Sequence, residues 1–121
     1  VEAAQELQAM GPKYVVIKKG EHGALLFNGD DIFCAPGLPL EEVFDPTGAG
    51  DTFVGGFSAY LVQCKSINFE DMKTAVIVGS ALASFTVQEF GTAALEKITY
   101  AQLAQRIKKF KSLTEFEIEL I

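Results

Sequence analysis

The segment from Thr52 to Cys64 contains no charged side chain, and this feature constrains the fold more than any other in the sequence. Within the segment Phe53, Phe57 and Leu61 recur at helical spacing,. A helix that lacks charge on every face is stable in water only when other structure covers it. We therefore expect a buried helix within a larger α/β fold.

Short apolar runs ahead of this helix predict β-strands. Tyr14-Val15-Val16-Ile17 is continuous, which is typical of a strand covered on both faces in a parallel sheet,. Residues 24–27 and 32–35 are separated by Asn28-Gly29-Asp30-Asp31, and an Asn-Gly pair strongly favours a hairpin,. A last strand is expected at 42–44. The sequence thus predicts a mainly parallel sheet with an antiparallel hairpin at its edge.

Further helices are expected on both sides of the uncharged one. The first ends at Gly11-Pro12, and we expect Ala3, Leu7 and Met10 to face inward,. Asn68 is a suitable N-cap for a long helix, and Thr99 for an amphipathic surface helix. The inward positions of that surface helix are expected to be Leu103, Ile107 and Phe110. The tail 115–121 alternates acidic and apolar residues, which predicts a half-buried edge strand,.

Composition excludes several classes of function. The chain has 121 residues, 49% of them apolar and 21% charged, as expected for one globular unit,. A formal charge of −6 disfavours nucleic acids and anionic membranes as partners,. The uncharged stretch from Thr74 to Gln88 is shorter than the roughly 18 to 20 residues of a membrane span,. Without a secretory leader a cytoplasmic location is expected, with Cys34 and Cys64 as reduced, mostly buried thiols,.

The chemistry is concentrated where the chain enters the uncharged helix. Gly48-Ala49-Gly50 would leave main-chain N–H groups unpaired at the positive end of the helix dipole, which makes an anion site,. An acid beside a bound anion is unfavourable unless it has a role, and for Asp51 the expected role is general base. The alternative is that Asp51 only caps the helix and the glycines only turn the chain.

The segment from Asp45 to Phe57, DPTGAGDTFVGGF, resembles the C-terminal signature of the PfkB/ribokinase family of carbohydrate kinases. The resemblance implies that Asp51 is the catalytic base and that Gly48, Ala49 and Gly50 form the anion hole. It also implies that Asp45 and the carbonyl of Thr47 lie near the monovalent-cation site, for an ion such as K⁺, that many members possess. Gly91-Thr92 resembles the loop that completes this cation site.

A second block, residues 15–24, is similar to the strand and loop with which the family contacts the nucleotide phosphates. Here Lys18 would neutralise phosphate charge, and Gly20 and Gly23 would allow close approach. Ser80, in a helical stretch of small residues, would lie beside the adenine. The alternatives are a solvated lysine at a strand end and small residues that serve helix packing.

Taken together, the resemblance implies a ribokinase-like, three-layer Rossmann-like α/β sandwich. Residues 1–121 would be its C-terminal nucleotide-binding portion, cut at Val1 from an absent N-terminal substrate and lid portion. The expected activity is ATP-dependent transfer of the γ-phosphoryl group, with Mg²⁺, to a hydroxyl of a small sugar or sugar derivative. The fragment alone is expected to be inactive, and its open sheet edge is a route to a homodimer. Two alternatives remain: an adenosine-type nucleoside kinase, and a non-catalytic nucleotide-sensing module.

Overall fold

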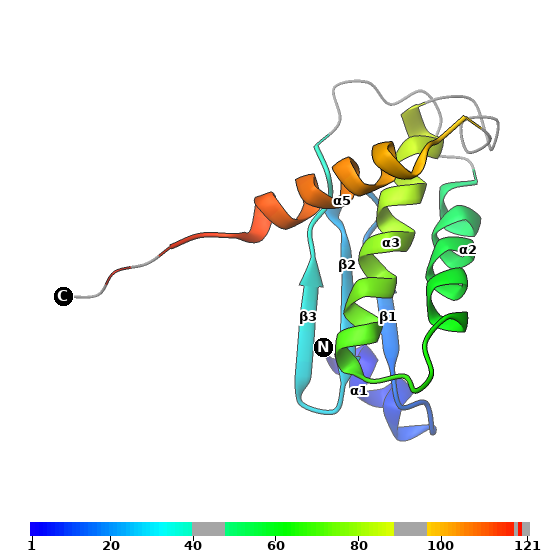
Figure 1. The fold of residues 1–121 in the computed structure, drawn as a ribbon. Coiled ribbons are helices and arrows are strands. Elements are labelled where there is room, and N and C mark those ends of the chain that lie inside the picture. The colour runs from blue at the N-terminus through cyan, green and yellow to red at the C-terminus, as the bar shows by residue number, and fades with distance from the viewer. Residues whose placement is uncertain (40–47, 89–96, 118, 120–121) are drawn as a thin grey trace.

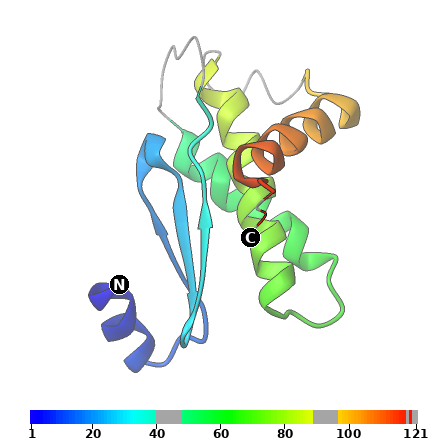
Figure 2. The same cartoon turned by 90° about the vertical axis from the view of Figure 1, so that its left-hand side faces the viewer.

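The described part of the chain folds into three layers, with a sheet between helices (Figures 1 and 2). The computed structural model describes residues 1–39, 48–88, 97–117 and 119. Helix α1 lies on one face of the sheet, helices α2 and α3 lie on the other, and α5 crosses α3. The elements in chain order are α1 (Glu2–Ala9), β1 (Val15–Lys18), the 3₁₀ turn η1 (Gly20–His22), β2 (Ala24–Asn28), β3 (Asp31–Ala35), α2 (Ala49–Val62), α3 (Phe69–Gln88) and α5 (Tyr100–Thr114).

The sheet has the order β1-β2-β3, and both of its pairings are antiparallel. Val16 pairs with Leu26, and Leu26 pairs with Phe33, so the predicted hairpin is confirmed. The three described strands contain no parallel pair, and the parallel neighbour expected for the run at 14–17 is not among them. The loop after β1 is too short for the crossover that a parallel neighbour needs, so β1 pairs with the next strand in antiparallel fashion. The expected strand at 42–44 lies outside the described residues.

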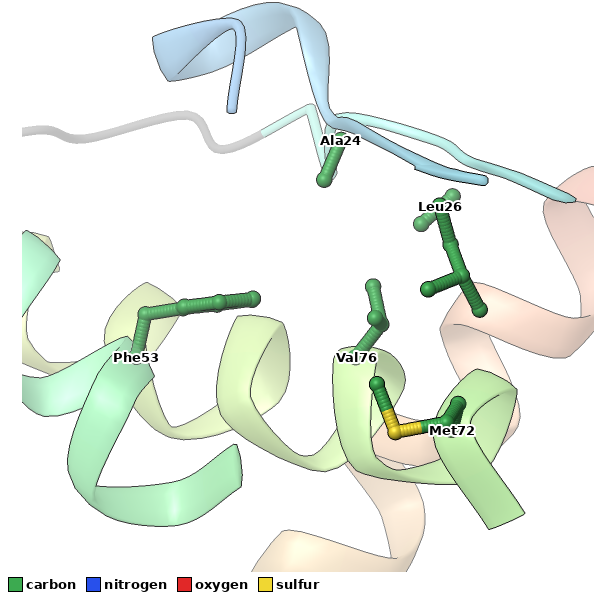
Figure 3. Packing of buried hydrophobic residues seen from close by; sticks show 6 residues of the cluster. Ala24, Leu26, Phe53, Met72 and Val76 are labelled. Atoms are coloured by element: carbon green, nitrogen blue, oxygen red, sulfur yellow. The ribbon is translucent and has the colours of Figure 1, made fainter. Parts of the chain in front are cut away.

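Both faces of the sheet are covered, and this accounts for the continuous apolar run in β1. Successive residues of β2 point to opposite faces: Leu26 packs with Phe53 and Val76 of α2 and α3 (Figure 3), whereas Phe27 packs with Ala4 and Val15,. Leu26 is fully buried, and burial of such a side chain contributes about 1.5–3 kcal/mol,. The predicted helices on both faces are therefore confirmed. The cluster around Leu26 packs helices α2 and α3, which carry the candidate site, against the sheet.

Helices α1 and α2 correct two predictions about burial. In α1 only Ala4 is buried, while Leu7 and Met10 are exposed, so the inward face is one residue away from the predicted one. Helix α2 is buried on one face only, because it packs against α3 and the sheet while Val54 and Val62 remain exposed. Within the described residues, α2 is therefore not the fully covered helix that its composition predicts.

The predicted helix caps are confirmed. The Asn68 side chain accepts a hydrogen bond from the Asp71 N–H at 2.9 Å, and the N–H of Asn68 donates to the Asp71 carboxylate at 3.3 Å. Thr99 forms a capping box with Gln102 at the start of α5,. In α5, Phe110 is 2% exposed and points inward, as expected. These caps fix where α3 and α5 begin, and so which of their side chains face α2 and the sheet.

The tail and the cysteines differ from expectation. Residues 115–117 and 119 form no strand, and Phe116 is 80% exposed, because the chain after α5 runs away from the sheet and has no ladder partner (Figure 1),. Cys34 is exposed and Cys64 is half-buried, so the expectation of mostly buried thiols was wrong, although neither forms a disulfide. None of the described helices is long and apolar enough to cross a membrane.

Candidate active site

The first turn of α2 presents main-chain N–H groups that donate a hydrogen bond to no described residue. Gly48 caps the helix in the left-handed conformation, with φ +84° and ψ −8°, which glycine adopts without the penalty of a Cβ,. The N–H of Thr52 donates to the Gly48 carbonyl at 3.0 Å. The N–H groups of Ala49, Gly50 and Asp51 precede this hydrogen bond, as in every α-helix. Together with the positive end of the helix dipole, they can hold an anion.

Lys18, at the end of β1, brings a positive charge to the same place. A Cβ built on Gly50 would lie 3.4 Å from Lys18 Nζ, and that nitrogen lies 4.8 Å from the centroid of the Phe53 ring. The ammonium group of this exposed residue therefore lies beside the start of α2. An anion held by the amides of α2 would also be attracted to Lys18.

The loop after β1 packs closely against the end of β3. Gly23 has φ +98°, and a Cβ at this position would collide with the Ala35 carbonyl oxygen and lie 2.8 Å from Pro36 C. The N–H of Lys19 donates to the Gly23 carbonyl at 2.7 Å and closes the loop around η1. Only glycine fits at position 23, whereas a Cβ at Gly20 (φ +58°) would meet no atom within 4 Å. Gly23 is thus required for packing and Gly20 only for its backbone conformation.

These parts enclose a cavity of about 730 Å³. Six of the residues predicted from the sequence line it: Lys18, Gly20, Gly23, Ala49, Gly50 and Ser80. The far wall is formed by Ala83, Ser84 and Phe110 from α3 and α5. The volume lies within the range of roughly 300–1,000 Å³ that is usual for small-molecule and cofactor sites. The structure therefore brings the predicted phosphate-side and adenine-side residues to one cavity.

Asp51 lies on the other side of the same helical turn. Its side chain is exposed and lines a separate groove of about 520 Å³ with Gly55, Ala59, Tyr100 and Leu103. Gly48 lines neither hollow and contributes through its cap geometry. The predicted site is thus arranged around one helix end, with Asp51 lining one hollow and Lys18 and Ser80 lining the other.

Comparison with known proteins decides the family. Residues 1–98 match the pfkB family carbohydrate kinases. This chain belongs to the pfkB family.

Individual relatives agree with this assignment and with the predicted ribokinase-like fold. A nucleoside kinase from Methanothermobacter thermautotrophicus is 35% identical over 112 residues, which are 92% of this chain and 32% of that protein. The structure of a fructokinase from Vibrio cholerae O395, bound to fructose, ADP and calcium, has a TM-score of 0.77 and 26% identity over 88% of this chain and 34% of its own. A ribokinase from Thermotoga maritima has a TM-score of 0.72 and 30% identity, covering 88% of this chain and 34% of that one. This pfkB-family chain thus spans about a third of the length of these relatives.

The predicted cation site is not among the described residues. Asp45 and Thr47, and also Gly91-Thr92, lie in the ranges 40–47 and 89–96 that the structure does not describe. Within the described ranges no three His, Cys, Asp or Glu side chains are grouped so as to hold a metal ion. The assignment of Asp45 and Thr47 in this pfkB-family chain therefore stays a prediction.

Sequence reasoning missed a contact that α5 makes with Ser84, one of the residues that line the cavity. Arg106 Nη1 donates to Ser84 Oγ at 2.7 Å, and its guanidinium group lies 3.9 Å from the centroid of the Phe85 ring. Burial in this contact lowers the pKa of Arg106 below its ordinary value,. Ser84 follows Ser80 by one helical turn, so the spacing could have indicated that both face the same side. Nothing in the sequence of α5 indicated that Arg106 would reach it.

Proposed function

We propose that the whole protein is an ATP-dependent kinase that phosphorylates a hydroxyl of a small sugar or nucleoside. This chain would supply the nucleotide site and the catalytic base. The observation that carries the proposal is the first turn of α2. Its N–H groups have no acceptor among the described residues and lie beside the Lys18 ammonium, while the Asp51 carboxylate faces the neighbouring groove. These are the groups that phosphoryl transfer needs: donors for the charge on the phosphoryl oxygens and an acceptor for the alcohol proton.

In the proposed reaction the acceptor oxygen forms a bond to the γ-phosphorus while the bond from that phosphorus to the β–γ bridging oxygen breaks. The proton of the alcohol moves to Asp51, and ADP leaves with the bridging oxygen. The N–H groups of Ala49 and Gly50 and the Lys18 ammonium stabilise negative charge on the transferring group. The transition state of such transfers is loose, so the placement of Asp51 matters more than its basicity.

The cavity suggests how the nucleotide would lie. Lys18 lies beside the start of α2, where the phosphates would bind. Gly20 and Gly23 also line the cavity, and Ser80 lies on α3, where the base would bind. Mg²⁺ accompanying the nucleotide would neutralise phosphate charge. A monovalent cation near Asp45 and Thr47 belongs to the same proposal.

Two acceptor classes are supported by the relatives. Sugars are favoured by the likeness to fructokinase and ribokinase structures, and nucleosides by the 35% identical nucleoside kinase and by a 48% identical segment of a cytidine kinase from Thermococcus kodakarensis. The groove beside Asp51 is lined by small and apolar groups together with the Tyr100 ring, which could pack against a sugar or a base,. The observations leave both classes in the proposal.

The test is a panel assay with the full-length protein. Ribose, fructose, a fructose phosphate, adenosine and cytidine would each be incubated with ATP and Mg²⁺. ADP release and the mass of the product would then be measured. We expect ADP release that depends on one acceptor and a product heavier by one phosphoryl group. ATP binding without acceptor-dependent ADP release from a wide panel would instead support a nucleotide-sensing module.

A further inference from the structure

Two buried threonines connect the end of α3 to the anion-binding turn of α2. Thr86 is 0% exposed and Thr52 is 7% exposed, and they lie 34 residues apart in the chain. Thr86 Oγ1 lies 3.1 Å from Thr52 Oγ1, and Thr52 Oγ1 lies 3.0 Å from the carbonyl oxygen of Gly48. Thr86 lines neither of the two hollows, so it does not reach a ligand bound in either.

The direction of these hydrogen bonds follows from the number of protons. Each hydroxyl has one proton to donate, whereas a carbonyl oxygen can only accept. The Thr52 proton is used on the Gly48 carbonyl, so the proton between the two threonines must come from Thr86. The other acceptor near the Thr86 hydroxyl, the Leu82 carbonyl, is farther away at 3.5 Å. The chain of donation therefore runs from Thr86 to Thr52 to Gly48.

The Gly48 carbonyl accepts two hydrogen bonds. It accepts from the Thr52 hydroxyl and from the Thr52 N–H, both at 3.0 Å. The methyl group of Thr86 lies 4.0 Å from where a Cβ on Gly48 would be, so Thr86 also packs beneath this residue. A hydroxyl that bonds the carbonyl four residues earlier is common in helices. In this turn the Thr52 hydroxyl also accepts a hydrogen bond from Thr86, which belongs to a second helix.

The consequence concerns the N–H of Ala49. The carbonyl of Gly48 and the N–H of Ala49 belong to one peptide unit, which is planar, so fixing the carbonyl fixes the direction of the N–H. Gly48 has no Cβ to restrict its torsions, and its peptide would otherwise rotate more freely than that of any other residue type. The donors of an anion hole are effective only when they are already oriented before the charge develops.

We propose that Thr86 is a positioning residue for the reaction. Through Thr52 it fixes the Gly48–Ala49 peptide so that the Ala49 N–H points at the transferring phosphoryl group. This inference rests on the proposed function, because it assigns Thr86 to the same anion-binding turn. It predicts an effect on the transition state that exceeds the effect on substrate binding.

The test compares Thr86→Val, which removes the hydroxyl, with Thr86→Ser, which removes only the methyl group. In the full-length protein, T86V is expected to lower kcat about 3- to 10-fold, the size of one hydrogen bond, with less than twofold change in the KM of ATP or acceptor. T86S is expected to keep kcat within about twofold of wild type, since it preserves the donor. The matched control is T74V, because Thr74 makes a comparable bond to the Glu70 carbonyl on the exposed side of α3. T74V should leave kcat unchanged.

A second readout needs no turnover. The amide ¹H and ¹⁵N chemical shifts of Ala49 should move in T86V and stay near their wild-type values in T86S. This measurement tests the hydrogen bonds from Thr86 through Thr52 to Gly48 separately from the kinase assignment. Wild-type kcat together with an unmoved Ala49 signal in T86V would overturn the inference, as would equal losses in T86V and T86S. If T86V does not fold, the difference between T86A and T86S isolates the hydroxyl in the same way.

Discussion

The two hollows on either side of the first turn of α2 differ in what lines them. The larger cavity contains the Lys18 ammonium and the main chain of Gly20, Gly23 and Gly50, and none of the described residues that line it is acidic. The smaller groove contains the Asp51 carboxylate and is otherwise lined mainly by small and apolar groups. The cavity and the groove therefore carry charges of opposite sign, although Gly50 and Asp51, which line one each, are consecutive residues.

The difference supports the proposal that one helix end serves two substrates. Asp51, Gly55 and Ala59 follow one another at intervals of four residues, so they share the face of α2 that lines the groove,. Gly50 and Phe53 point to the cavity instead. An anionic nucleotide is favoured on the Lys18 side and would be repelled on the Asp51 side. The groove is therefore the proposed place for an acceptor that carries less negative charge than the nucleotide, and its hydroxyl would meet the phosphoryl group at the end of the helix.

The largest effect is expected from Asp51→Asn. Removing the proton acceptor should lower kcat about 10²- to 10⁴-fold, the usual contribution of general-base catalysis. ATP affinity should change less than twofold, because Asp51 lies outside the cavity. Steady-state kinetics and ATP titration of the full-length protein measure the two quantities, with Asp31→Asn in the hairpin as control. An unchanged rate with ATP still bound would remove the base assignment and favour a nucleotide-sensing role.

The next largest effect concerns the wall of the cavity. Gly23→Ala combines a positive φ with a collision against the Ala35 carbonyl, and should lower the free energy of unfolding by about 2–4 kcal/mol,. Gly20→Ala has a positive φ but open space, and should cost about 1 kcal/mol,. Denaturant unfolding measures both values. If both variants lost the same free energy of unfolding, the contact of Gly23 with the end of β3 would not shape the cavity.

Lys18→Met tests the charge of the cavity. Loss of one charged partner of the phosphates should raise the KM of ATP roughly 10-fold. The KM of the acceptor should stay near its wild-type value, because Lys18 does not line the groove. Lys19→Met is the matched control, since the neighbouring lysine is exposed and lines neither hollow. If K19M weakened ATP as much as K18M, the effect would come from net charge and not from position.

Features that act over a few residues could be predicted from the sequence. The Asn28-Gly29 turn fixed the hairpin, and Asn68 and Thr99 capped their helices, because each needs only its neighbours in the chain. The glycine-rich opening of α2 was predictable for the same reason. The residues of the cavity were predicted because a family resemblance placed two distant blocks at one site.

What could not be predicted depends on how elements face one another. Helical periodicity could not choose between Ala3 and Ala4 as the centre of the buried face of α1, since both are apolar and adjacent. It also could not show that Lys18 and Asp51 line two different hollows. The Thr52–Thr86 hydrogen bond joins two helices across 34 residues, and no local pattern encodes such a contact.

The smallest effect is expected from Gly55→Ala, which probes the groove without touching the cavity. A Cβ at Gly55 would meet no atom within 4 Å, so alanine should stabilise α2 by about 0.5–1 kcal/mol through its higher helix propensity,. At the neighbouring Gly56 a Cβ would lie 2.7 Å from Leu82 Cδ1 and 3.2 Å from the Cα of Gly79, so Gly56→Ala should destabilise the fold.

Thermal unfolding of the two variants should therefore shift in opposite directions. In G55A the added methyl group enters the groove one turn after Asp51, so the KM of the acceptor should rise a few-fold while the KM of ATP is unchanged,. A G55A variant that weakened ATP as much as the acceptor would show that the two hollows act as one site, and the division of the substrates between the two faces of α2 would be wrong.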